Sequence, residues 1–166
     1  MKRNSTLILL FAGFVLVIGI VLAAILNDEQ PIRYNHEKHI QDADLECVDC
    51  HRNVETGERA SIPNIETCSE CHDDTEDENE EIRKVATYVD EGKRIPWKQV
   101  NVVPDYAFFS HRRHVFLGKI KCETCHGNVA SMVTPFSEPY REITMDWCLD
   151  CHQDRQVSSD CYACHR

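Results

Sequence analysis

All ten cysteines of this 166-residue chain belong to one repeated motif, Cys-x-x-Cys-His. The five copies, numbered in chain order, are motif 1 (Cys47, Cys50, His51), motif 2 (Cys68, Cys71, His72), motif 3 (Cys122, Cys125, His126), motif 4 (Cys148, Cys151, His152) and motif 5 (Cys161, Cys164, His165). No cysteine is left over for a disulfide or a free thiol. Cys-x-x-Cys pairs also bind zinc, but a zinc site does not require a histidine directly after every pair. The motif with its histidine is the attachment site of a c-type haem.

The spacing within the motif follows from this chemistry. Two cysteines one short turn apart each form a thioether with one haem vinyl group, and the adjacent histidine is held under the iron as its proximal ligand. The sequence therefore predicts five covalently attached c-type haems, with all ten cysteines as thioether ligands and the histidine of each motif as proximal ligand. Few long apolar runs follow residue 27, so packed porphyrins are expected to supply much of the core.

The intervals between motifs are too short for large structural elements. The sequence thus predicts a multihaem c-type cytochrome that is mostly irregular, with short α-helices packed on five haems and almost no sheet. Residues 81–92 carry apolar side chains at helical spacing and end at Gly92, which predicts a short helix. Residues 94–109 contain two prolines and are predicted to be extended. The acidic run 73–81 is typical of a solvated linker or a helix start.

The segment Leu7–Leu26 has neither a charge nor a proline. Its length suits a helix that crosses about 30 Å of hydrocarbon, whereas the apolar region of a cleaved signal peptide has about 7–15 residues. Lys2 and Arg3 precede the segment and Asp28 follows it, which leaves the N terminus in the cytoplasm. The sequence therefore predicts one uncleaved transmembrane helix in the bacterial inner membrane. The haem motifs would then face the periplasm, an oxidising compartment.

Four histidines lie outside the motifs: His36, His39, His111 and His114. They form two His-x-x-His pairs, each eleven residues before a motif. A low-spin haem needs a second axial ligand on the opposite face of its iron. Residues i and i+3 of a helix project from a similar face at different heights, so one histidine can reach the next haem and the other a different haem close by. A zinc site at such a pair would need further ligands that are already committed.

A His-x-x-His pair followed by closely spaced motifs resembles the class III multihaem cytochromes, loosely over residues 34–166 and well over 108–166. In that fold the first histidine of the pair serves the haem just downstream and the second serves the following one. The resemblance implies that His36, His39, His111 and His114 are the distal ligands of motifs 1, 2, 3 and 4, in that order. The fifth distal ligand would lie just before motif 4, where "EITMDWCLDCH" has Met145. Met132, in "CHGNVASM", is the alternative.

A narrower resemblance rests on "IPWKQVNVVPDYAFFSHRRHV", "CHGNVASM" and "TMDWCLDCH" together with the anchor and five motifs. These features look like the pentahaem subunit of alternative complex III, a bacterial quinol:electron-acceptor oxidoreductase. The resemblance implies a polysulfide-reductase-type quinol-binding membrane subunit, an iron–sulfur subunit and a downstream cytochrome or oxidase as partners. The expected organisation is an anchor (1–30), a two-haem unit with an acidic linker and helix (31–92) and a three-haem unit (93–166).

The predicted function is electron transfer from a quinol-oxidising membrane complex towards a periplasmic acceptor, by a subunit with no catalytic residue of its own. An autonomous single-anchor quinol dehydrogenase that feeds a periplasmic reductase is the alternative. A multihaem reductase needs one open haem face, whereas four histidines and one methionine fill all five distal positions. The formal charge of −10 argues against nucleic-acid binding, which needs a basic face, and favours a basic partner.

The motif count generates the first prediction. Pyridine haemochrome analysis of the purified protein should give five haems per chain, because each motif holds one haem through two thioethers. The double variant Cys161→Ala/Cys164→Ala should lose one haem in the same measurement, and Ser159→Ala should lose none. Fewer than five haems in the unmodified chain would contradict the assignment.

Overall fold

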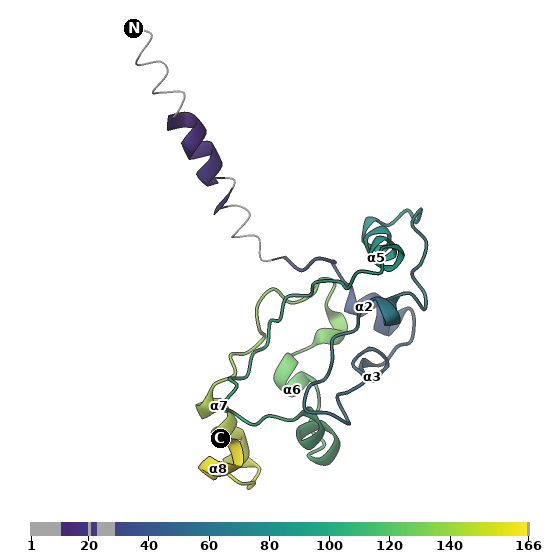
Figure 1. The fold of residues 1–166 in the computed structure, drawn as a ribbon. Helices are drawn as coiled ribbons and strands as arrows, with labels where there is room; N and C mark the ends of the chain where they lie inside the picture. The colour runs from purple at the N-terminus through teal and green to yellow at the C-terminus, as the bar shows by residue number, and fades with distance from the viewer. Residues whose placement is uncertain (1–10, 20, 23–28, 166) are drawn as a thin grey trace.

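The computed structural model describes residues 11–19, 21–22 and 29–165 of the chain. Residues 11–19 and 21–22 are helical. The helical elements that follow are α2 (His36–Gln41), α3 (Cys47–Cys50), α4 (Ile65–Cys68), α5 (Glu80–Asp90), the π-helix η1 (Arg112–Leu117), α6 (Glu123–His126), the 3-10 helix η2 (Val129–Ser131), α7 (Met145–Asp154) and α8 (Cys161–Cys164). Figure 1 shows these short elements strung along long irregular segments, with α5 and α8 at opposite ends of the body.

Strands are nearly absent from the described part of the chain, where β-pairing is limited to an isolated bridge between Ala107 and His165. The predicted architecture of short helices with almost no sheet is therefore confirmed. The helix predicted over residues 81–92 corresponds to α5, and residues 94–109 contain no helix, as their prolines predicted. The end of the acidic run starts α5, whose N-cap Asn79 accepts a hydrogen bond from the Glu81 N–H (2.9 Å).

Several of the helices that carry predicted haem-binding residues begin at a polar cap. The side chain of Asn35 accepts from the Lys38 N–H (3.0 Å) at the start of α2, and Thr144 accepts from the Trp147 N–H (3.2 Å) at the start of α7. Asp160 accepts from the Tyr162 N–H (2.9 Å) at the start of α8. Such caps satisfy backbone donors that a short helix leaves free, so they fix where each turn begins.

A small apolar core lies between α4, α5 and the segments on either side of them. Ile32, Val85 and Ile95 are buried and form its centre. The side chains packed against this centre are Ile65, Cys68, Tyr88, Val89 and Trp97. Because Cys68 belongs to motif 2, the core positions that motif directly. The core also fixes the start of the main body (residues 29–165), because Ile32 lies four residues before α2.

The N-terminal and C-terminal halves of the main body are in contact. The Gln30 Nε2 group donates to the carbonyls of Lys98 (3.0 Å) and Phe136 (3.1 Å). The Glu37 N–H donates to the Met132 carbonyl (3.1 Å), which fixes η2 against α2. The two segments predicted as separate haem units therefore pack on each other.

The predicted transmembrane helix, Leu7–Leu26, lies only partly within the described residues, which include 11–19 and 21–22 of it. In the portion of the chain that the structure covers, no helix is both long enough and apolar enough to cross a bilayer. The helical residues 11–19 carry exposed apolar side chains, among them Phe11 (70% exposed) and Leu16 (65% exposed).

The buried Asn64 generates the second prediction. It is 6% exposed, and its side chain bonds to both the N–H (2.8 Å) and the carbonyl (3.1 Å) of Ile95 as well as to the Ile65 N–H (3.0 Å). Asn64→Ala should lower the free energy of unfolding by about 1–3 kcal/mol, because it leaves buried backbone groups unpaired. Denaturant unfolding of the haem-loaded protein measures this change. Replacement of the exposed Asn53 by alanine is the control, and equal stabilities of the two variants would contradict the role of Asn64.

Candidate haem-binding sites

Most of the motifs close through a backbone hydrogen bond from the histidine N–H to the carbonyl of the first cysteine. The N···O distance is 2.8 Å in motifs 1 and 5, 2.9 Å in motif 2 and 3.0 Å in motif 3, while motif 4 lies within α7. Residues i, i+3 and i+4 of such a turn share one face, so both thiols and the imidazole project to the same side. All ten cysteines lie in the described range and none forms a disulfide. This arrangement suits attachment of a porphyrin and ligation of its iron by one motif.

Backbone carbonyls orient several of the imidazole rings. His51 Nδ1 lies 2.8 Å from the Ser61 carbonyl, and His152 Nδ1 lies 2.7 Å from the Ser158 carbonyl. His39 and His114 are oriented in the same way, because the Nδ1 atom of each lies within 2.8 Å of the backbone carbonyl four residues earlier. A carbonyl accepts from a protonated Nδ1, and that tautomer leaves Nε2 free to bind a metal ion.

Three of the four extra histidines face a motif histidine across a similar gap. The ring centroids are 5.9 Å apart for His39 and His72, 6.5 Å for His111 and His126, and 6.1 Å for His114 and His152. Two imidazoles on opposite sides of one metal ion, each bonded at about 2.0–2.1 Å, have centroids about 6.3 Å apart. The residues therefore fit bis-histidine ligation of a haem iron at motifs 2, 3 and 4.

His36 lies close to the motif 1 histidine. Burial, followed by the nearby His51 and His39, lowers the pKa of His36 to about 4. Burial is also the main cause that lowers the pKa values of His72, His111 and His126. Since metal ions bind the neutral imidazole, these histidines are in the ligating form at neutral pH.

The first histidine of each pair has different surroundings at its Nδ1 atom. Among the described residues, the buried Nδ1 of His36 has no hydrogen-bond partner. His111 Nδ1, at the equivalent position of the second pair, lies 2.9 Å from the Glu58 carbonyl. The carbonyl fixes the orientation and the tautomer of the His111 ring, whereas no such acceptor among the described residues fixes the His36 ring through its Nδ1.

Two aromatic residues hold the histidine pairs, a role that the sequence did not predict for either of them. The Tyr34 ring stacks on His39 (4.3 Å between centroids) and meets His36 edge-on (4.7 Å). Phe109 stacks on His114 (4.6 Å) and meets His111 edge-on (4.9 Å). The repeat "Y-x-H-x-x-H" and "F-x-H-x-x-H" was the signal that could have identified both residues.

The ring of the motif 5 histidine has a different neighbour. Tyr106 faces His165 with ring centroids 5.9 Å apart and an angle of 24° between the rings. Met145 begins α7 and is 60% exposed. Met132 is half-buried, and its backbone carbonyl contacts α2 near motif 1. The structure therefore brings an aromatic residue, not a histidine, to the ring of this last motif.

The two halves of the body share a cavity of about 530 Å³. Cys47 of motif 1 and Cys122 of motif 3 both line it. Their apolar neighbours in the wall are Ile40, Leu45, Val48, Val115, Ile120 and Ala130. An apolar cavity beside an attachment cysteine fits a macrocycle that carries its polar groups at one edge.

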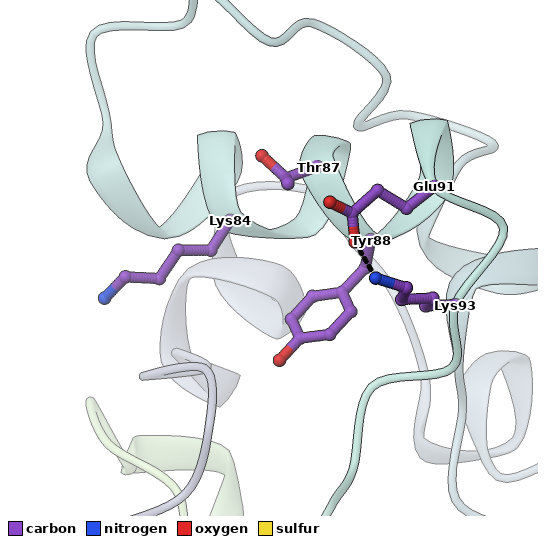
Figure 2. Close-up of a pocket in the computed structure, with 5 residues that line it drawn as sticks. All are labelled: Lys84, Thr87, Tyr88, Glu91 and Lys93. Carbon is purple, nitrogen blue, oxygen red and sulfur yellow. Dashed lines mark ion pairs between the residues drawn. The ribbon is translucent and has the colours of Figure 1, made fainter.

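A second hollow lies on α5. It has a volume of about 420 Å³, and Figure 2 shows the side chains of Lys84 and Tyr88 projecting from the helix at its edge. Lys93 forms an ion pair with Glu91 (2.9 Å) at the same place. The residues that line this hollow include neither a cysteine nor a histidine. It is therefore not a haem-attachment site.

Comparisons with known proteins agree with this geometry. Residues 21–95 match the class III cytochrome C family, and residues 107–166 match the family of cytochrome c7 and related cytochrome c. The chain belongs to the class III and cytochrome c7-type multihaem cytochromes. It is 34% identical over 164 residues to the "Menaquinone reductase, multiheme cytochrome c subunit" of Nitratidesulfovibrio vulgaris (strain Hildenborough). The match covers 83% of this chain and 77% of that relative.

The His39–His72 pair generates the third prediction. His39→Ala should convert one of the haems from low-spin to high-spin, because it removes one axial ligand from an iron that keeps His72. The measurement is the ferric high-spin EPR signal at neutral pH. Lys38→Ala is the matched control, since this neighbour in α2 is exposed. If the His39 variant stays fully low-spin, this pair does not ligate a common iron.

Proposed function

We propose that this chain is the electron-transfer subunit of a membrane complex that reacts with quinones. The observation that carries the proposal is the set of facing imidazoles, which can supply two axial ligands at each of motifs 2, 3 and 4. Bound haem supplies reversible one-electron chemistry. The chain's own residues would attach the haem, orient its ligands and supply both axial ligands, so a substrate would have no open face to bind at these motifs. This favours electron transfer over a reductase with its own substrate site.

The proposed distal ligands are His36, His39, His111 and His114 for motifs 1 to 4. Support for the last three comes from the ring separations. For His36 it comes from its electrostatic coupling to His51 and from its equivalence to His111 in the repeated sequence. Together with five proximal histidines, these residues would make four bis-histidine haems and one haem with another distal ligand.

The relative supports the proposed partners. It is named as a subunit of a menaquinone reductase, so we propose that this chain also works with a membrane protein that binds a quinone. A polysulfide-reductase-type membrane subunit and an iron–sulfur subunit, as in alternative complex III, are the partners we propose. The relative's name describes electrons passing to menaquinone, whereas the sequence predicted electrons leaving a quinol. The potentials of the partners would set that direction.

We further propose that Leu7–Leu26 anchors the protein in the inner membrane, with the haem motifs in the periplasm. The exposed apolar side chains of residues 11–19 support this, because a helix that exposes such side chains suits a lipid environment. The charges that flank the segment support the orientation.

Isolation from native membranes tests the proposed complex. The full chain, solubilised in mild detergent, should co-purify with a quinone-binding membrane subunit. An autonomous quinol dehydrogenase would instead purify alone and oxidise a quinol analogue without any partner. Isolation of the chain alone with that activity would overturn the proposal.

Met145 is the proposed fifth distal ligand. It lies one helical turn before Cys148, and the Cys148 thiol lies close to the Cys164 thiol of motif 5, which supports a position of this face of α7 near the last motif. Met132 is anchored against α2 instead. A methionine ligand raises the reduction potential of a haem, which would make motif 5 the high-potential end.

The fourth prediction follows from this assignment. Met145→His should lower the potential of the highest-potential haem and abolish the near-infrared band of His/Met ligation, as measured by redox titration and absorption spectroscopy. Met132→Leu and Tyr106→Phe are the matched controls and should leave both properties unchanged. Loss of the band in Met132→Leu, with no change in the Met145 variant, would assign the ligand to Met132.

A further inference from the structure

We infer that the five motifs form one unbranched series in space whose order differs from their order in the chain: 2, 1, 3, 4, 5. Motif 1 is then an internal member and motif 2 is a terminal one. This inference deepens the proposed function and rests on it. The order of the motifs matters for electron transfer because each motif would hold one redox group. It is carried by contacts between attachment residues and by the segments that supply ligands to two motifs at once.

Motifs 2 and 1 are neighbours because α2 serves both of them. His39 faces His72 of motif 2, whereas His36, one turn earlier, lies beside His51 of motif 1. Tyr34 connects the same two motifs. Its ring stacks on His39, and its hydroxyl lies close to Cys50 of motif 1 and to Cys68 of motif 2.

Motifs 1 and 3 are neighbours although they are far apart in the chain. Cys47 and Cys122 line the same cavity of about 530 Å³, and their side chains lie close to each other. The loop after motif 1 also contacts His111, the proposed distal ligand at motif 3. In that loop the Glu58 carbonyl accepts from the His111 backbone N–H (2.9 Å) and lies 2.9 Å from His111 Nδ1.

Motifs 3 and 4 are neighbours because one segment supplies the ligands of both. His111 faces His126 of motif 3, and His114, one turn later, faces His152 of motif 4. Cys125 lies close to both cysteines of motif 4. This junction repeats the arrangement at α2, with Phe109 in the place of Tyr34.

Motifs 4 and 5 complete the series. The Cys148 thiol of motif 4 lies close to the Cys164 thiol of motif 5. The Cys164 carbonyl accepts from the Phe108 N–H (2.6 Å), which ties motif 5 to the segment that leads into η1. In Figure 1, α7 and α8 lie together at one end of the body.

The two ends of the series differ in their relation to the N-terminal segment. Cys68 of motif 2 packs on the core that contains Ile32, and the Arg33 N–H donates to Glu81 at the start of α5 (2.7 Å). The chain from the proposed anchor therefore joins the body at the motif 2 end, while α8 lies at the opposite end (Figure 1). Motif 2 is the end that would face the membrane partner, and motif 5 is the end that would face the periplasmic partner.

The experiment uses the full haem-loaded chain and makes one further haem at a time diamagnetic, relative to the unmodified chain at the same potential, where the proposed His/Met haem of motif 5 is already reduced. His39→Met and His111→Met each keep a sixth ligand but raise the potential of one haem, so that it can be reduced while the bis-histidine haems stay oxidised. The readout is the EPR line of each remaining ferric haem, which sharpens when a neighbouring spin is lost. His39→Met should sharpen the motif 1 line alone, and His111→Met should sharpen the lines of motifs 1 and 4.

A sharpened motif 3 line in His39→Met, or an unchanged motif 1 line in His111→Met, would overturn the proposed order. Either result would still leave five low-spin haems and electron transfer intact. Failure of the proposed function would look different, because high-spin haem would then be present in the unmodified chain. If a variant does not fold, removal of the same haem through Cys68→Ala/Cys71→Ala or Cys122→Ala/Cys125→Ala gives the same comparison.

Discussion

Pairs of imidazole rings held about 6 Å apart are the constraint on which the rest of this structure depends. The three separations lie between 5.9 and 6.5 Å, although the paired histidines come from different segments of the chain. Short capped helices, carbonyl acceptors at Nδ1 and the stacked rings of Tyr34 and Phe109 all serve to fix these rings. Since bond lengths to a metal ion vary little, a ring displaced by about one ångström would lose its ligation.

The core that side chains form is small, as expected of a chain whose interior depends mainly on the haem-binding motifs. In the described part of the chain, the buried apolar residues are Ile32, Val54, Val85, Ala86 and Ile95. They gather mainly around α4 and α5, at the motif 2 end. Elsewhere the irregular segments run past the motifs with apolar side chains at the surface, which suits a protein whose large apolar cofactors are covalently attached.

The two histidine pairs show how a repeated sequence acquires different surroundings. α2 is an α-helix and η1 is a π-helix, yet both pairs present their second histidine to a motif histidine at nearly the same distance. The first histidines differ, because His111 has a carbonyl partner at Nδ1 and His36 has none among the described residues. A hydrogen bond to a ligating histidine raises its basicity, so the haems of motifs 1 and 3 would differ electronically despite equal ligand sets.

The sequence by itself determined the local chemistry: the attachment motifs, the pairing of the extra histidines and the scarcity of sheet. The motifs and the histidine pairs are each set within about one helical turn, where side-chain spacing decides which groups share a face. The resemblance to class III cytochromes implied which motif each extra histidine serves, whereas only the tertiary structure decided the ring separations and which motifs are neighbours. Those relations depend on contacts between distant segments, such as Glu58 with His111 and Cys47 with Cys122. Tyr106 came beside His165 in the same way, because folding brings together residues whose spacing in the chain carries no periodic signal.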